Sequence, residues 1–203
     1  MSLYGLIISF ALLLVAMTVH EFAHALVAYK LGDPTAKYSG RLTLNPLAHI
    51  DLIGTIILPL FLFITTNGRF VFGAAKPVPI NYQSLRNPKR GIVLIGASGP
   101  AANFIFAVLL SILWRAVPQT GLINFIFANL ISINVILGVF NLLPVPPLDG
   151  SRILIGLLPD DLAHQYSRIE PYGFFIVMLL IAAGAFQMLI APVVRSILSI
   201  LML

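Results

Sequence analysis

The sequence predicts an all-α polytopic membrane protein with about five to six membrane segments and a small β element near residues 67–80. Of the 203 residues, 59% are apolar and only 9% are charged, against roughly 25% charged in an ordinary soluble domain. The mean hydropathy is +1.00. So few charges cannot cover a soluble surface, which argues against a soluble domain, a disordered chain and a nucleic-acid-binding module. The net charge of +5 therefore bears on membrane topology.

Long apolar runs define the predicted segments. They cover residues 3–31, 50–66, 91–117, 121–143, 151–158 and 172–203, with polar loops between several of them. The first run is long enough to cross a bilayer of roughly 30 Å. It does not resemble a secretory signal, because it lacks a basic n-region and is too long. Residues 70–80 are aromatic, β-branched and broken by Pro77 and Pro79, which predicts an extended strand or a short hairpin at a sheet edge.

Basic residues predict the topology. The loop 67–90 contains several basic residues and no acidic one, so we expect it on the cytoplasmic side. The loop 32–45 is also expected there. Both placements hold only if 50–66 enters the membrane and returns. Its short length and its internal glycine and proline favour this re-entrant interpretation, and the alternative is a full span with one loop that violates the rule.

The first apolar run contains His20-Glu21-Phe22-Ala23-His24, which matches H-E-x-x-H. In a helix, positions i and i+4 lie on one face, so both imidazoles can bind one zinc ion. Glu21 can then act as a general base on a water that the metal activates. Ionised residues cost roughly 2–3 kcal/mol each inside a lipid-embedded helix, which favours a functional site. The alternative is a buried polar cluster for helix packing or a proton path.

A catalytic zinc usually has three protein ligands, and the chain has no cysteine. The candidates for the third ligand are Asp33, His49, Asp51, Asp149, Asp160, Asp161, His164 and Glu170. Asp149 is favoured, because it lies between a proline-broken stretch and a new apolar segment, where an acid is costly unless it binds something. The alternative role for Asp149 is the N-cap of a helix over 151–158.

Other polar residues near the apolar runs have simpler interpretations. His49 and Asp51 could form a second polar cluster near the site, but a turn at the membrane surface is favoured. Asn103 follows a run of small residues that allows close helix approach, and it needs a hydrogen-bond partner at that depth. A plain helix–helix contact accounts for Asn103 about as well as a functional role. Interhelical polar contacts are also predicted for Asn129, Asn134 and Gln187.

Three stretches occur together in this chain. They are HEFAH at 20–24, GPAAN (G-P-x-x-N) at 99–103 and NLLPVPPLDG (N-x-x-P-x-P-x-L-D-G) at 141–150. In pattern and order they resemble the site-2 protease family of intramembrane zinc metalloproteases. The stretch NPLAHID at 45–51 resembles the compact bacterial branch that lacks a PDZ domain, and no PDZ-like domain is expected here.

The resemblance implies that His20, His24 and Asp149 bind one zinc ion, that Glu21 is the catalytic acid/base, and that Asn141 steadies the substrate carbonyl. The expected activity is that of a zinc metalloendopeptidase, which hydrolyses a peptide bond in or next to a transmembrane segment of a substrate protein. Residues 1–203 are expected to form a single multi-pass domain in the cell membrane, with the site recessed from the cytoplasmic face. The expected partners are the substrate and the lipid bilayer, with no nucleic acid.

Two other functions compete with proteolysis. A membrane zinc transporter or sensor would need a polar path across the bilayer, and the first 19 residues contain no charged side chain to form one. A scaffold that binds membrane partners without cleaving them would not need Glu21. If the chain is a protease, the 70–80 segment could pair with an unwound substrate by β-addition, because a helical peptide bond is hidden from a protease.

Overall fold

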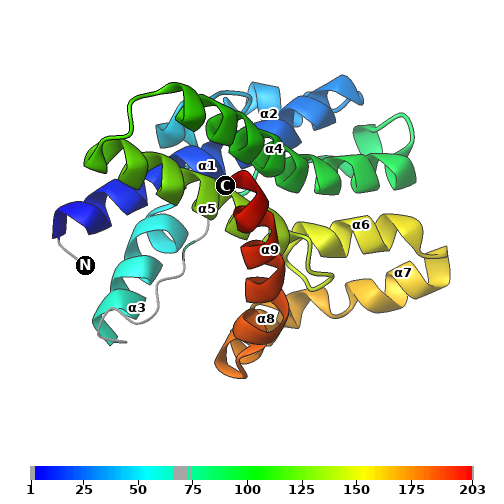
Figure 1. Cartoon of the computed structure of the whole chain (residues 1–203). Coiled ribbons are helices and arrows are strands. Elements are labelled where there is room, and N and C mark those ends of the chain that lie inside the picture. Colours follow the sequence, from blue (N-terminus) through cyan, green and yellow to red (C-terminus); the bar gives the residue numbers. More distant parts are fainter. Residues whose placement is uncertain (1–2, 66–72, 74, 203) are drawn as a thin grey trace.

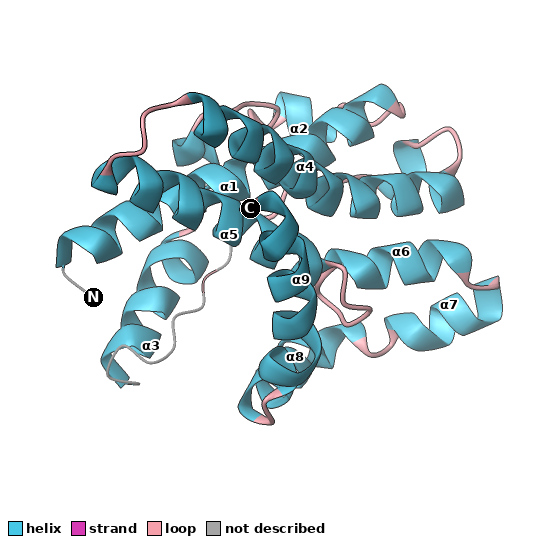
Figure 2. Cartoon of the chain, viewed as in Figure 1, coloured by secondary structure: helices cyan, strands magenta, loops and turns pink. Residues whose placement is uncertain are grey.

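The structure is a computed structural model that describes residues 3–65, 73 and 75–202. The α-helices are α1 (Leu3–Lys30), α2 (Thr35–Tyr38), α3 (Leu58–Thr65), α4 (Pro88–Ala116), α5 (Gly121–Asn141), α6 (Asp149–Leu157), α7 (Asp160–Ser167), α8 (Gly173–Ala182) and α9 (Ala191–Leu201). Short 3-10 turns are η1 (Pro46–His49), η3 (Tyr82–Ser84) and η4 (Glu170–Tyr172), and π-helical turns are η2 (Leu52–Ile57) and η5 (Phe186–Ile190). The described residues form no strand (Figure 2).

Three helices are long and apolar enough to cross a membrane: Ile7–Lys30 of α1, α4 and α5. A fourth span is present if residues 160–182 and 186–201, which are bent by 74° at their junction, count as one. The chain is thus a multi-pass membrane protein, but within its described part the predicted five to six segments are not confirmed. The described helical run 52–65 is about 21 Å long at 1.5 Å per residue, and residues 66–72, which follow it, lie outside the described part of the chain.

Helices α1, α4 and α5 pack against one another and form the core (Figure 1). Small residues permit this close approach. Gly138 of α5, for example, lies where a Cβ atom would come within 2.8 Å of the Phe104 ring on α4. Helix α9 packs against α4 and α5, and the three helices share a cluster of buried apolar side chains that includes Leu110, Ile131 and Val194.

Helix α6 runs alongside α4 and also lies beside α7 (Figure 1). Two glycines make the contact between α4 and α6 tight. A Cβ atom at Gly96 would lie 3.1 Å from the Asp149 carbonyl oxygen, and one at Gly156 would lie 2.4 Å from Val93. Helix α7 occupies most of 159–171, the polar stretch between the apolar runs 151–158 and 172–203 that the sequence predicts as a loop. That interpretation was wrong, because a short amphipathic helix with charged ends has the same composition as a loop.

The predicted β element is not confirmed. Residues 67–72 and 74 lie outside the described residues, and Gly73 and 75–80 are neither strand nor helix. The segment 75–80 is nevertheless held in place. The Lys76 N–H donates to the His49 carbonyl at 3.0 Å, and the Val78 N–H donates to Glu21 Oε2 at 3.0 Å. This segment therefore reaches the H-E-x-x-H sequence on α1.

Candidate metal centre

His20 and His24 lie one turn apart on the same face of α1, as the i, i+4 spacing predicts. Both side chains are buried. Their rings meet edge to face with centroids 4.6 Å apart, and their Nε2 atoms are 3.0 Å apart. The two ring nitrogens therefore face the same point in the core.

Asp149 reaches this point from a different part of the chain. Helix α5 ends at Asn141, the chain turns through its proline-rich stretch, and α6 begins with Asp149. Asp149 Oδ2 lies 3.0 Å from His20 Nε2 and 3.3 Å from His24 Nε2. The N-cap position is Leu148, and no side chain caps this helix, so the alternative role of Asp149 as N-cap is wrong.

The second nitrogen of each imidazole already has a partner. His20 Nδ1 is 2.7 Å from Asn103 Oδ1, and His24 Nδ1 is 2.8 Å from the Ile95 carbonyl. A carbonyl oxygen only accepts hydrogen bonds, so each Nδ1 must carry the hydrogen. A neutral imidazole then has a lone pair on Nε2.

Three electron-rich atoms thus converge: two Nε2 lone pairs and one carboxylate oxygen. Asp149 Oδ2 is buried and accepts no hydrogen bond from the described residues. The three residues can each offer one ligand atom within 4.8 Å of the others. Ligands about 2.0–2.2 Å from a tetrahedral zinc ion stand about 3.3–3.6 Å apart, and here the separations are 3.0–3.3 Å. The donor set and its spacing fit zinc.

Gly99 of α4 closes one side of this group. A Cβ atom at position 99 would lie 2.4 Å from His24 Nε2 and 2.6 Å from His20 Nε2. Contacts under 3.0 Å are not sustained, so only glycine lets α4 pass this close to the two imidazoles. The G-P-x-x-N stretch therefore contributes a backbone wall as well as Asn103.

Glu21 directly follows His20 on α1 and is half-buried. Its Oε2 accepts the hydrogen bond from the Val78 N–H. This contact links residues 57 positions apart, and the sequence alone does not identify Val78 as part of the site. A backbone N–H cannot be recognised from the type of side chain. Only the prolines on both sides of Val78, which predict extended backbone, indicated that this segment is unusual.

Asn141, at the last position of α5, is half-buried, and its Nδ2 donates to the Leu137 carbonyl at 3.0 Å. That bond uses one of the two amide hydrogens. In the described structure no hydrogen bond joins Asn141 to His20, His24 or Asp149.

His49 and Asp51 are held by local hydrogen bonds and do not belong to the metal-binding group, which consists of His20, His24 and Asp149. His49 Nε2 donates to the Thr43 carbonyl at 2.9 Å, and Asp51 Oδ2 accepts from the Gly54 N–H at 2.6 Å. These bonds belong to the turn that leads into η2, which agrees with the favoured interpretation.

The other candidate ligands also lie outside the group of three. Asp33 accepts from the Asn81 N–H at 2.7 Å. Asp160 pairs with Lys89 at 2.7 Å, and Glu170 pairs with Arg152. Among the described residues, the three ligands that the sequence predicts, His20, His24 and Asp149, are therefore the ones that lie close together.

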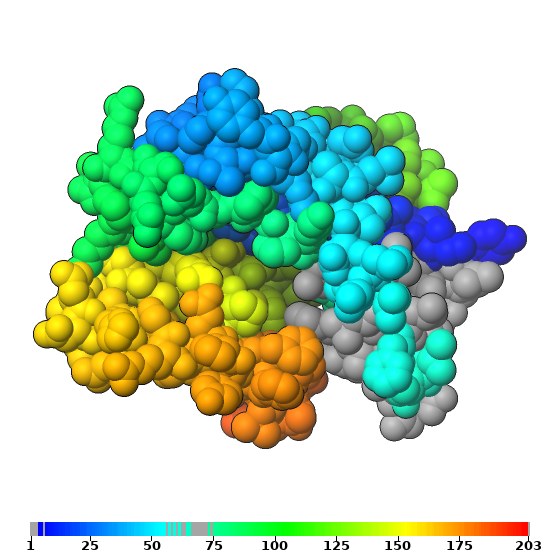
Figure 3. All heavy atoms as spheres, turned by 180° about the vertical axis from the view of Figure 1, so that it is seen from behind, coloured from blue at the N-terminus to red at the C-terminus, as the bar shows by residue number. Residues whose placement is uncertain are grey.

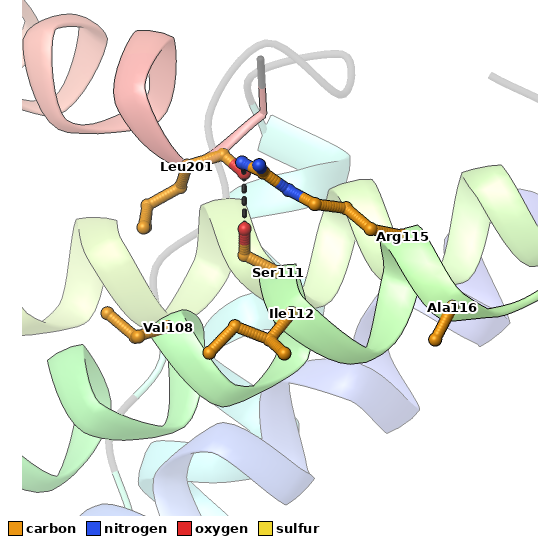
Figure 4. A pocket seen from close by; sticks show the side chains of 6 residues that line it. All are labelled: Val108, Ser111, Ile112, Arg115, Ala116 and Leu201. Carbon is orange, nitrogen blue, oxygen red and sulfur yellow. Dashed lines mark hydrogen bonds between the residues drawn. The ribbon is translucent and has the colours of Figure 1, made fainter.

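A cavity of about 440 Å³ lies elsewhere, between α4 and the end of α9 (Figure 4). The Ser111 hydroxyl donates to the Leu201 carbonyl, and the Arg115 guanidinium reaches the same oxygen at 3.5 Å. None of the three candidate ligands lines this cavity. Its polar groups already serve to fasten α9 to α4, so it is not the reaction site.

Known proteins are similar in sequence to this chain. Residues 112–184 match the family described as Peptidase family M50. A Bacillus subtilis protein, provisionally named zinc metalloprotease YwhC, is 39% identical over 194 residues, which are 91% of this chain and 84% of that protein. The chain belongs to peptidase family M50, the site-2 proteases. It is therefore a peptidase, and zinc is the expected cofactor of this M50 member.

Two more distant relatives are longer than this M50 chain. Rip2 of Mycolicibacterium smegmatis, also provisionally named a zinc metalloprotease, is 33% identical over 85% of this chain and 65% of its own length. Zinc metalloprotease MJ0392 of Methanocaldococcus jannaschii is 26% identical over 92% of this chain and 45% of its own length. No solved structure matches the chain.

The family match covers Asn141 and Asp149 but not the H-E-x-x-H sequence. That Asp149 of α6 lies next to His20 and His24 of α1 is shown by the structure and not by the family match.

Proposed function

We propose that this M50 peptidase is an intramembrane protease that hydrolyses a peptide bond in or next to a transmembrane segment of a substrate protein. His20, His24 and Asp149 hold one zinc ion, and Glu21 is the general base. The observation that carries the proposal is the convergence of two imidazole lone pairs and a buried carboxylate oxygen beside Glu21, on helices apolar enough to cross a membrane.

When bound, zinc supplies Lewis-acid activation of a water molecule and of the scissile carbonyl. Glu21 takes the proton of the attacking water and then passes it to the leaving amine. The Val78 N–H holds one carboxylate oxygen of Glu21, which limits rotation of the base. Asn141 keeps one amide hydrogen besides the one that it gives to the Leu137 carbonyl, and in this proposal it donates that hydrogen to the developing oxyanion.

The substrate must unwind before its peptide bond reaches Glu21, and the segment 75–80 supports a way to hold it. Extended backbone turns the N–H and C=O of alternate residues to opposite edges. The N–H groups of Lys76 and Val78 are already used, and Pro77 and Pro79 have none. An added substrate strand would therefore donate its own N–H groups to the carbonyls of the two prolines.

The chain is proposed to lie in the cell membrane as a single metalloprotease domain over 1–203, with its site open toward the cytoplasm. The basic residues of the loop before α4 support this orientation. Seen from behind, the surface is hollowed between the described part of this loop, residues 75–87, and α6 (Figure 3). That hollow is a route by which an unwound segment could approach the site.

The proposal is tested on detergent-purified protein and on proteoliposomes that contain a model single-span substrate. Glu21→Gln should keep zinc at the wild-type level, since Glu21 is not a ligand, and should lower the cleavage rate roughly 10²–10⁴-fold. Glu170→Gln is the matched control. Glu170 is the only other glutamate of the chain, it is exposed and paired with Arg152, and its loss should leave cleavage unchanged.

Other outcomes separate the competing functions. Cleavage by Glu21→Gln at the wild-type rate would contradict the assigned base. Zinc binding without cleavage of any membrane substrate by the wild type would favour the scaffold. Zinc flux into the vesicles would favour the transporter.

A further inference from the structure

A chain of hydrogen bonds crosses the three-helix core and ends on His20. Asn103 of α4 and Asn134 of α5 are both 0% exposed. Asn103 Oδ1 lies 2.7 Å from His20 Nδ1, and Asn103 Nδ2 donates to Asn134 Oδ1 at 2.7 Å and to the Ala16 carbonyl at 3.2 Å. Asn134 Nδ2 donates to the Leu130 carbonyl at 2.8 Å.

The direction of this chain follows from its two ends. The carbonyls of Leu130 and Ala16 can only accept. Asn134 must therefore turn its NH₂ group toward Leu130 and its oxygen toward Asn103. Asn103 must in turn point its NH₂ group at two acceptors, which leaves its oxygen for His20. The orientation of both amides is thus decided by main-chain groups.

The consequence reaches the metal-binding atom. Because Asn103 presents an oxygen, His20 must carry its hydrogen on Nδ1, and its Nε2 keeps the lone pair that faces Asp149 and His24. The same requirement at His24 is met by the Ile95 carbonyl, a backbone group that substitution does not remove. The Ser98 hydroxyl also lies 3.2 Å from His24 Nδ1, but it donates its own hydrogen to the Ile95 carbonyl. The tautomer and orientation of the His20 ring depend instead on the side chain of Asn103.

Asparagines of α5 show the bond that such a side chain makes within its own helix, and Asn134 makes it as well. Asn129 and Asn141 each donate to the carbonyl four residues earlier in their own helix. Asn103 instead directs both of its hydrogens to other helices and its oxygen to an imidazole. A plain contact between α4 and α5 would not need the bond to His20.

We propose that Asn103 and Asn134 are positioning residues that hold His20 in the tautomer and orientation required for zinc binding. This inference rests on the proposed zinc site and deepens it. Asn103 acts directly on the ring, and Asn134 acts through Asn103 by fixing which way its amide points. Outer partners of metal-bound histidines commonly have this role.

The test is the zinc dissociation constant of the detergent-purified protein, measured by competition with a chromophoric chelator. Asn103→Leu should weaken zinc binding roughly 10–100-fold, the usual cost of losing an outer partner. Asn134→Leu should cause a smaller loss, because Asn103 keeps its bonds to Ala16 and His20. Asn129→Leu is the matched control on α5, and its zinc affinity should equal that of the wild type.

Two further measurements exclude a purely structural role. Asn103→Asp keeps an oxygen toward His20 Nδ1 but loses the hydrogens that go to Ala16 and Asn134, so it should bind zinc more tightly than Asn103→Leu and less tightly than the wild type. The ¹⁵N spectrum of labelled histidine in the metal-free protein should report hydrogen on Nδ1 of His20 in the wild type, and Asn103→Leu should shift that signal. Thermal unfolding without metal, measured in parallel, reports the contribution of the asparagines to helix packing.

A result in which both leucine variants unfold at lower temperature but bind zinc as tightly as Asn129→Leu overturns the inference. If Asn103→Leu does not fold, the comparison of Asn134→Leu with Asn129→Leu decides, and equal affinities overturn it. His20→Ala separates this inference from the proposed function. If His20→Ala also binds zinc normally, the zinc site itself is wrong, whereas loss of zinc in His20→Ala alone refutes only the positioning role.

Discussion

Gly99 offers a direct test of where the metal-binding group lies. In Gly99→Ala the new Cβ atom would stand 2.4 Å from His24 Nε2 and 2.6 Å from His20 Nε2. An ordinary van der Waals contact of 3.4 Å therefore requires a displacement of about 1 Å, either of α4 or of the imidazoles. Ligand distances in a zinc site tolerate only about 0.2 Å. We expect the zinc affinity of Gly99→Ala to fall by at least roughly 100-fold, the upper end of the cost of losing an outer partner.

Crowding alone must be distinguished from damage to the site. Gly138→Ala is the matched control, because its Cβ atom would stand 2.8 Å from the Phe104 ring at another contact of the core. Overpacking of this kind costs roughly 1–3 kcal/mol of stability, so Gly138→Ala should unfold at a lower temperature and still bind zinc. The assay is zinc content after dialysis, with thermal unfolding measured on the same samples. Wild-type zinc content in Gly99→Ala, or equal loss in both variants, would refute the reasoning.

Two predictions concern the third ligand and the topology. Asp149→Ala should lose zinc on dialysis. His49→Ala and Asp51→Ala should retain it, because both of these side chains are held by backbone groups of their own turn. If Asp149→Ala retains zinc, Asp149 is not a ligand. Single cysteines at Lys37 and Arg86, in a chain without native cysteine, should both be labelled only from the cytoplasmic side if 50–66 re-enters. Labelling from opposite sides would mean a full span.

The parts of the site that depend on local spacing could be predicted from the sequence. The i, i+4 histidines face one point because helix geometry alone puts them there. Asp149 could be favoured because an acid beside a proline-broken stretch in an apolar chain needs a compensating partner. The structure brings these three residues together, although no local rule states how far α6 lies from α1.

Features that depend on packing or on backbone donors could not be predicted in the same way. Aromatic and β-branched residues in 70–80 indicate extended backbone, but a strand also needs a partner for its N–H and C=O groups. In 75–80 the prolines remove two donors, and the Val78 N–H is directed to Glu21. Apolar runs likewise indicate burial or membrane contact without deciding length, so the short run 151–158 was counted toward the segments although α6 has nine residues.

The tautomer of His20 is still harder to predict from the sequence. Nothing in H-E-x-x-H states which ring nitrogen carries hydrogen, because that depends on an oxygen supplied by α4, which is oriented in turn by α5. Asn134 stands 114 positions after His20, and its hydrogen bonds in the described structure go to Asn103 and Leu130, so a sequence interpretation treats it as an ordinary helix contact. A polar contact between membrane helices can therefore set the state of a metal ligand on a third helix. Its substitution should change zinc affinity even where the helices stay packed.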